Sequence, residues 1–353
     1  MRDALRARVR AWLVEGALPL WRGVGVDDAP GGFGVFEALD HEGAPRADLP
    51  KRVRVQARQV FAFATASKRL GAGDMDLARR LFADTMRVAF DETDGRLAGS
   101  LDRGGRPLST PHDLYDLAFM ILADASLGGE RGDALWSALE ALKAEKGWFE
   151  AAARPTPRRQ NPHMHLFEAA LAQIEAGDAR YAPVAEECLS LMREVFFDGG
   201  ALLEFFDADW RPVAAGQSIE PGHMAEWVYL LDWCERATGA AAGVDLAKLF
   251  AAAETGREGG LLIDAVSPHT PTRRLWPQTE YLKAALVIER RGGVPRTLAD
   301  EIVQAIFSTY LSPPVAGGWW DQFDAEGRLL SETMPASSLY HLIGAFLAYL
   351  DAD

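Results

Sequence analysis

Histidine, whose ordinary pKa is the closest to neutrality, is concentrated just after prolines in this sequence. Of the seven histidines, five come within two helical turns after one of the prolines that are expected to lead helices: His112, His163, His165, His223 and His341. A neutral imidazole accepts a proton and an imidazolium donates one, so two histidines facing across a cavity can act as a general base and a general acid. We therefore expect acid–base chemistry, with His223 and His341 as the candidate pair.

Charged side chains accompany this pair. Glu226 follows His223 by three residues, which places both on one face of a helix that begins at Pro221. The carboxylate would either hold the imidazole in one tautomer or only stabilise the positive end of the helix dipole. Arg58 lies in an apolar run, where it is either a buried, paired arginine or a clamp for an anion.

Several further residues carry two interpretations each. His163 and His165 are two positions apart, about 200° around a helix, so only one of them can face a cavity. Trp276 either packs in the core or stacks against a sugar ring. Glu280 either belongs to the site or only stabilises a helix N-terminus. At this level the alternatives stay open.

Signatures of other chemistries do not occur. The sequence has no Walker A loop, no glycine-rich dinucleotide motif after a strand, no His-Glu-x-x-His pair and no Gly-x-Ser-x-Gly elbow. The histidines also lack the spacing of a strong metal site. We therefore predict a reaction that uses neither a metal nor a cofactor.

Composition disfavours several classes of partner. The 353 residues carry a formal net charge of −14 without a basic cluster, which argues against nucleic-acid binding. No run approaches the ~18 apolar residues of a membrane span, and residues 2–17 suit an amphipathic helix better than a secretion signal. The two cysteines, Cys188 and Cys234, fit a reduced protein. We expect a cytoplasmic monomer or homodimer that binds a small molecule.

Helical periodicity dominates the chain and must position these residues. Twelve helices are predicted, at residues 2–17, 50–71, 74–90, 111–127, 131–146, 162–177, 180–197, 221–239, 242–256, 277–292, 295–311 and 335–351. Long linkers alternate with short turns between them, and the glycines that begin the linkers recur every 52–63 residues: Gly32, Gly95, Gly147, Gly199, Gly260 and Gly317. Aspartate and glycine inside the linkers predict short β-hairpins. A period of this length indicates a repeat architecture.

The helix after each long linker is led by a proline: Pro50, Pro111, Pro162, Pro221, Pro277 and Pro335. Short turns make antiparallel neighbours, so the repeating unit is a helical hairpin, and there are six. Neither end of the chain offers the polar face of a capping repeat, which favours closure into a ring. We predict an all-α, single-domain (α/α)6 barrel over residues 1–353. The six proline-led helices would lie inside, with their N-termini at one cavity that favours anionic species.

Five blocks of sequence fall on these inner helices: Arg54-x-x-x-Arg58, Asn161 to Ala169, Glu220 to Trp227, Arg274 to Glu280, and Ser338 to His341. In this order, between about residues 10 and 350, they resemble the signature blocks of the N-acylglucosamine 2-epimerase family. The family contains sugar isomerases and sugar 2-epimerases built as (α/α)6 barrels. The resemblance therefore implies the fold that the repeat predicts independently.

The resemblance also implies roles for individual residues. His223 and His341 would be the catalytic acid–base pair, and Arg58 the ligand of the sugar and of its enediolate. The pocket would be completed by Tyr115, Asn161, Met164, His165, Glu226, Trp276 and Glu280. Ser337 stands where some mannose isomerases carry a larger polar residue, which leaves the choice of sugar open.

The residues and the resemblance together predict a metal-independent isomerase that interconverts mannose, or a close relative, and fructose through a cis-enediolate. A 2-epimerase acting on N-acylglucosamine, on glucose and mannose, or on cellobiose is the alternative. More remote alternatives on the same fold are an inverting glycoside hydrolase, which needs two carboxylates, and a sugar-binding module without activity. Whether the sugar is free, phosphorylated or sulfonated stays open.

Overall fold

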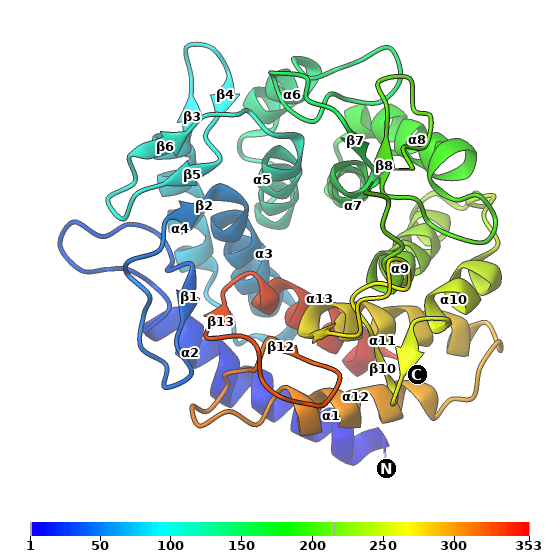
Figure 1. Cartoon of the computed structure of the whole chain (residues 1–353). Coiled ribbons are helices and arrows are strands. Elements are labelled where there is room, and N and C mark those ends of the chain that lie inside the picture. The colour runs from blue at the N-terminus through cyan, green and yellow to red at the C-terminus, as the bar shows by residue number, and fades with distance from the viewer. Residues whose placement is uncertain (1, 215, 353) are drawn as a thin grey trace.

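The computed structural model describes residues 2–214 and 216–352. The chain is mostly helical, as predicted, and its helices form two concentric rings (Figure 1). The inner ring consists of α3 (Val53–Leu70), α5 (Leu114–Leu127), α7 (Gln160–Glu175), α9 (Pro221–Thr238), α11 (Leu275–Arg290) and α13 (Ser338–Asp351). Each of these helices packs against the next, and α13 packs against α3, so the ring is closed.

The outer ring is made by the helices that follow the short turns, together with the N-terminal segment. Its members are α4 (Met75–Ala89), α6 (Gly132–Glu140), α8 (Ala182–Leu191), α10 (Leu246–Glu254) and α12 (Leu298–Thr309). The first predicted helix is α1 (Arg2–Ala11), which continues through a π-helical segment (Trp12–Ala17) into α2 (Leu18–Gly23). Helix α1 contacts both α12 and α13, so the N-terminal segment lies beside the last two helices of the chain.

Burial distinguishes the two rings as the amphipathic patterns require. Helix α11 is buried almost all round, because it packs between α9, α12 and α13. Helix α4 instead buries one stripe, which includes Leu77, Leu81 and Phe82, and turns its charged side chains to solvent. A helix that is apolar all round belongs inside, and one with a single apolar stripe belongs at the surface. Polar residues on the inner helices therefore either face the central cavity or are buried against a hydrogen-bonding partner, as Gln278 is against Leu262.

Short strands of the long linkers pair at the end of the ring where the inner helices begin, some between two linkers and some within one. The pairs are β1 (Ala38–Leu39) with β13 (Met334–Pro335), β7 (Arg158–Arg159) with β8 (Phe205–Phe206), β11 (Arg273–Arg274) with β12 (Gln322–Phe323), β3 (Phe90–Asp91) with β4 (Arg96–Leu97), and β9 (Arg257–Glu258) with β10 (Leu261–Leu262). A three-stranded sheet contains β2 (Lys51–Arg52), β5 (Ser100–Leu101) and β6 (Pro107–Ser109). All pairs are antiparallel, and β1 with β13 links the first linker to the last.

Only one of the six inner helices begins at the proline that was predicted to lead it. Pro221 is the first residue of α9, whereas Pro162 and Pro277 lie two residues inside α7 and α11. These two prolines are tolerated there because first-turn N–H groups have no intrahelical acceptor. Pro50, Pro111 and Pro335 precede their helices by three residues. Strand or bridge pairing by Lys51, Asp113 and Pro335 keeps these connections extended, so the prediction was wrong in these details.

None of the helices in the described part of the chain is long and apolar enough to cross a membrane.

Candidate active site

A cavity of about 430 Å³ opens among the N-terminal ends of the inner helices. It is lined by Arg52, Arg58, Tyr115, Asn161, His165, Glu220, His223, Glu226, Arg274, Trp276, Asp321, Pro335, Ser337, Ser338 and His341. Nine of the eleven residues predicted for the site belong to this lining. The exceptions are Met164, which is buried in the core, and Glu280, which lies behind His341.

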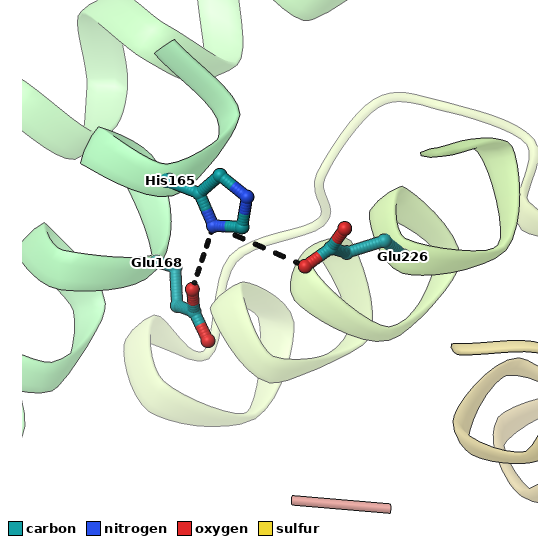
Figure 2. A group of neighbouring side chains, drawn as sticks. All are labelled: His165, Glu168 and Glu226. Atoms are coloured by element: carbon teal, nitrogen blue, oxygen red, sulfur yellow. Dashed lines mark hydrogen bonds and ion pairs between the residues drawn. The ribbon is translucent and has the colours of Figure 1, made fainter. Parts of the chain in front are cut away.

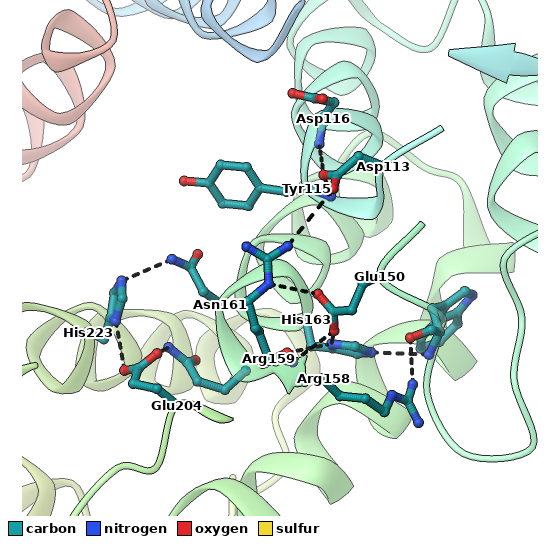
Figure 3. Close-up of polar contacts among 12 residues, drawn as sticks. Asp113, Tyr115, Asp116, Glu150, Arg158, Arg159, Asn161, His163, Glu204 and His223 are labelled. Atoms are coloured by element: carbon teal, nitrogen blue, oxygen red, sulfur yellow. Dashed lines mark hydrogen bonds and ion pairs between the residues drawn. The ribbon is translucent and has the colours of Figure 1, made fainter. Parts of the chain in front are cut away.

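His223 is held by a carboxylate that the helical spacing does not indicate. Its Nδ1 donates to Oε1 of Glu204 at 2.8 Å (Figure 3). A carboxylate oxygen of Glu220 lies 3.8 Å from the same nitrogen. The prediction that Glu226 orients His223 was therefore wrong. Burial opposes protonation of His223, but Glu204 and Glu220 outweigh it and raise its pKa to about 9. His223 is consequently an imidazolium near neutral pH.

Asn161 contacts the other ring nitrogen of His223. Its Nδ2 lies 3.2 Å from Nε2, while its Oδ1 is buried and has no partner among the described residues. The amide nitrogen can donate to a neutral imidazole. If the side-chain amide rotates by about 180°, its oxygen can instead accept from an imidazolium. Asn161 therefore suits a histidine that changes its charge during a reaction.

His341 has a similar carboxylate contact and the opposite charge state. Its Nδ1 donates to Oε1 of Glu280 at 2.8 Å. Burial lowers the pKa of His341 to about 4; Glu280 opposes this shift, and Arg58 and Lys283 reinforce it. The ring is thus neutral near neutral pH. The hydrogen bond from Nδ1 leaves the lone pair of Nε2 available to accept a proton.

Trp276 lies against both histidines. Its ring centroid is 5.1 Å from that of His223 and 5.8 Å from that of His341. Gly222 permits this arrangement, because a Cβ at its position would come within 2.7 Å of Cη2 of Trp276. One indole therefore sets the positions of both histidines in the cavity wall.

Arg58 supplies positive charge near the pair. It is only 7% exposed, and its Nη2 donates to the hydroxyl of Tyr115 at 2.8 Å. Its guanidinium lies 4.1 Å from the ring centroid of Phe119. Among the described residues Arg58 forms no ion pair with a carboxylate, unlike Arg54, which pairs with Asp116. Of the two predicted alternatives, this geometry favours an anion clamp over a paired structural arginine.

The two neighbouring histidines of α7 divide as their spacing requires. His163 is fully buried, accepts from the backbone N of Trp148 at 3.1 Å and contacts the carbonyl of Arg159 at 3.1 Å (Figure 3). Burial lowers its pKa to about 3, so it is a neutral structural group. His165 instead lines the cavity. The prediction that only one of them faces the cavity is confirmed.

His165 belongs to a buried cluster with two glutamates (Figure 2). Its Nδ1 lies 3.1 Å from Oε2 of Glu168 and 3.9 Å from Oε1 of Glu226. Burial lowers the pKa of His165, and burial together with the charge of Glu280 raises that of Glu226 well above its ordinary value. The raised pKa favours the protonated form of Glu226, which can donate a hydrogen bond to a sugar hydroxyl.

Two groups of three side chains place possible metal-ligand atoms close to one another. One group is His165, Glu168 and Glu226, and the other is Glu226, Glu280 and His341. Lys283 already supplies a cation to these carboxylates, at 2.5 Å from Oε2 of Glu280. The donor set is thus neutralised by a side chain of the protein. We assign no metal to either group.

Sequence reasoning missed the charged residues that the linkers contribute to the cavity lining and to the contacts behind it. Glu204, Glu220 and Asp321 lie in long linkers, and burial raises the pKa of Asp321 to about 6. Arg52 and Arg274 directly precede inner helices, and each is paired with a carboxylate of the preceding linker, Glu37 and Asp264. The available signal was position alone, because Glu220 and Arg274 are the first residues of two of the blocks that were recognised.

Comparisons with known proteins agree with this geometry. The sequence profile of the N-acylglucosamine 2-epimerase (GlcNAc 2-epimerase) family matches residues 34–345. A mannose-6-phosphate isomerase of Rhizobium meliloti (strain 1021) is 39% identical over 95% of this chain and 94% of that protein. Among solved structures, the cellobiose 2-epimerase of Bacillus thermoamylovorans B4167 superposes with a TM-score of 0.85 at 18% identity, covering 99% of both chains. A D-mannose isomerase superposes with a TM-score of 0.82 at 19% identity, covering 99% of this chain and 98% of that one.

Proposed function

Because the chain belongs to the N-acylglucosamine 2-epimerase family, we propose that it is a metal-independent aldose–ketose isomerase that interconverts mannose, or a close relative of mannose, and fructose. It is an enzyme that acts on carbohydrates, and we assign it to the (α/α)6 barrels as one catalytic domain. The observation that carries the proposal is the histidine pair. His341 and His223 lie on the same cavity with pKa values of about 4 and about 9. Titratable groups whose pKa values are pushed apart serve as base and acid.

The reaction follows from these charge states. Nε2 of neutral His341 takes the proton from C2 of the open-chain aldose, and the electron pair of that bond moves toward C1 and its oxygen. The resulting cis-enediolate is stabilised by Arg58 and receives a proton on O1 from the imidazolium of His223. Return of the first proton from His341 to C1, with loss of the O2 proton to His223, gives the ketose and restores both histidines.

Epimerisation at C2 is the alternative outcome at the same site. It requires that the proton return to C2 from the opposite face, which assigns that delivery to His223. His223 lies on α9 and His341 on α13, and both contact the indole of Trp276. The site therefore has one acid–base group on each of two inner helices. The orientation of the enediolate between them decides between the products.

Hydrolysis of a glycosidic bond is poorly supported by the cavity. An inverting glycosidase needs two free carboxyl groups flanking the scissile bond. Here histidines occupy the centre, Glu204 is engaged by His223, and Glu280 is engaged by His341 and Lys283. A binding module without activity would not require two histidines with opposed pKa shifts.

The charges at the cavity mouth favour an uncharged sugar. Arg274 is bound to Asp264 at 2.9 Å and lies 3.6 Å from Glu220, and Arg52 is bound to Glu37. A phosphate dianion would meet arginines that are already neutralised, beside Glu220 and Asp321. The relative named mannose-6-phosphate isomerase makes the 6-phosphate ester the first competing substrate to test.

A proton NMR assay in D2O tests the proposal with mannose, fructose, glucose, N-acetylglucosamine, cellobiose and mannose 6-phosphate. We expect fructose from mannose, with kcat/KM for mannose above that for its 6-phosphate ester. Conversion of mannose into glucose without ketose would establish the epimerase alternative. Absence of both turnover and deuterium incorporation with every sugar would overturn the proposal.

A further inference from the structure

A second cavity, of about 580 Å³, opens at the opposite end of the ring, where the inner helices end. Its lining includes Lys68 and Arg69 near the end of α3, and Arg236 near the end of α9. Lys283 also lines this cavity and does not line the one that contains the histidine pair. Lys283 therefore reaches the wall between the two cavities from the side away from the substrate.

A chain of polar contacts crosses this wall. Nζ of Lys283 lies 2.5 Å from Oε2 of Glu280, and Oε1 of Glu280 lies 2.8 Å from Nδ1 of His341. Glu280 is completely buried, and Lys283 is 4% exposed. One carboxylate thus contacts a histidine of the candidate active site with one oxygen and a lysine behind the site with the other.

Because Glu280 is buried, its charge must be compensated by the groups that contact it. A buried carboxylate that has no cation beside it is unfavourable. Either its own pKa rises, or the group that it contacts binds a proton and supplies the positive charge. Paired only with Glu280, the imidazole of His341 would bind an additional proton and lose its basic lone pair. An ammonium group on the second carboxylate oxygen removes the need for that proton.

We propose that Lys283 is a positioning residue for His341, which keeps Glu280 a carboxylate from behind the active site and so keeps Nε2 of His341 free to act as the base. The proposal rests on the isomerase or epimerase function proposed above. It adds a residue that never touches the sugar.

Other charged and titratable groups face Lys283 or His341 from the surrounding inner helices. Helix α9 contributes Glu226 and Tyr229, whose ring centroid is 4.8 Å from Nζ of Lys283. Helices α7, α13 and α3 contribute Glu168, Tyr340 and Arg58. On the outer face of α11, Tyr281 bonds to Glu254 of α10, and Glu289 accepts the backbone N of Ala299 in α12. Those two contacts point away from the wall.

The direction of the electrostatics agrees with the geometry. Burial opposes the charged forms of Glu280 and Lys283, yet Lys283 and His341 lower the pKa of Glu280, and the carboxylates raise that of Lys283. The base must be unprotonated, so activity is lost as pH falls through the pKa of His341. Removing the ammonium should raise that pKa and move the acid limb of kcat/KM toward neutrality.

The test compares Lys283→Met with Lys68→Met, which removes an exposed charge from the same second cavity. In Lys283→Met we expect kcat/KM at about pH 5 to fall about tenfold and at about pH 8 by less than about threefold. Lys68→Met should retain the parent profile. A uniform loss across the pH range, or an acid limb that does not move, would overturn the proposal.

Histidine-selective 15N NMR separates this proposal from the proposed function and needs no turnover. In the parent protein His341, assigned with His341→Gln, should stay neutral with its proton on Nδ1 at all pH values above about 5. This spectrum stays informative if Lys283→Met does not fold. A His341 that is protonated near neutral pH, or that carries its proton on Nε2, would overturn the role of Lys283 even in an active isomerase.

Discussion

The two histidine–glutamate pairs of the cavity have the same hydrogen-bond geometry and opposite charge states. In each pair Nδ1 lies 2.8 Å from a glutamate oxygen, yet the pKa is raised to about 9 in His223 and lowered to about 4 in His341. The hydrogen bond therefore does not decide the charge of the ring. The decisive difference is what surrounds the carboxylate.

Each pair receives its surroundings from a different part of the fold. Glu204 comes from a linker, and a second linker carboxylate, Glu220, adds negative charge beside His223. Glu280 comes from an inner helix, where Lys283 of the same helix compensates it and Arg58 faces the ring of His341. Linker carboxylates thus produce an acid, and a neutralised carboxylate in the helical core produces a base.

The strongest test of this difference replaces each histidine by glutamine. We expect kcat/KM to fall about 10³-fold in both His223→Gln and His341→Gln, because general acid–base groups contribute about 10²–10⁴-fold. Exchange of the C2 hydrogen with D2O should disappear in His341→Gln, since that residue is the base. Near-parental activity in either folded variant, judged by circular dichroism, would refute the pair, and loss of exchange only in His223→Gln would reverse the roles.

Glu204→Gln should convert the acid toward an ordinary histidine. The acid must be protonated, so activity is lost as pH rises through the pKa of His223, which is about 9. Without the charge of Glu204 the alkaline limb of kcat/KM should move down by about one to two pH units, with about twofold to tenfold lower activity at about pH 8. Glu220→Gln, at 3.8 Å, is the matched variant and should move the limb less. An unmoved alkaline limb in Glu204→Gln would show that another group sets it.

Gly222→Ala should disturb both pairs together without altering either charge state. The new Cβ would come within 2.7 Å of Cη2 of Trp276, so the indole that contacts both histidines must move. We expect kcat to fall about fivefold to tenfold, with both limbs of the pH profile in place, because a small displacement of positioned groups is costly. Gly344→Ala is the control, since a Cβ there meets nothing within 4 Å. Shifted limbs would indicate that Trp276 influences the charges.

Treatment with EDTA should have the smallest effect. Lys283 neutralises the carboxylates that offer metal-ligand geometry, so we expect full activity after dialysis against the chelator. A loss of activity that added divalent metal restores would show that a bound metal ion, and not only Lys283, compensates the charge of these carboxylates.

Much of the fold was accessible from the sequence, because local patterns report local structure. The alternating linkers and the period of the glycines predicted paired helices, and Pro221 begins its helix as predicted. Other helix starts were misplaced, since whether Lys51 or Asp113 is helical depends on pairing with Leu101 or Ala151, which are distant in the sequence. Propensity at a boundary cannot report such a partner.

The sequence by itself determined that His223, His341 and Arg58 reach the cavity, because each lies in the first turns of an inner helix. Only the tertiary structure decided what each of them does there. Glu226, three residues from His223, instead lies 3.9 Å from His165, and Glu204, nineteen residues away along the chain, is the partner of His223. Electrostatic interactions and burial depend on distance through space, and closure of the ring sets those distances.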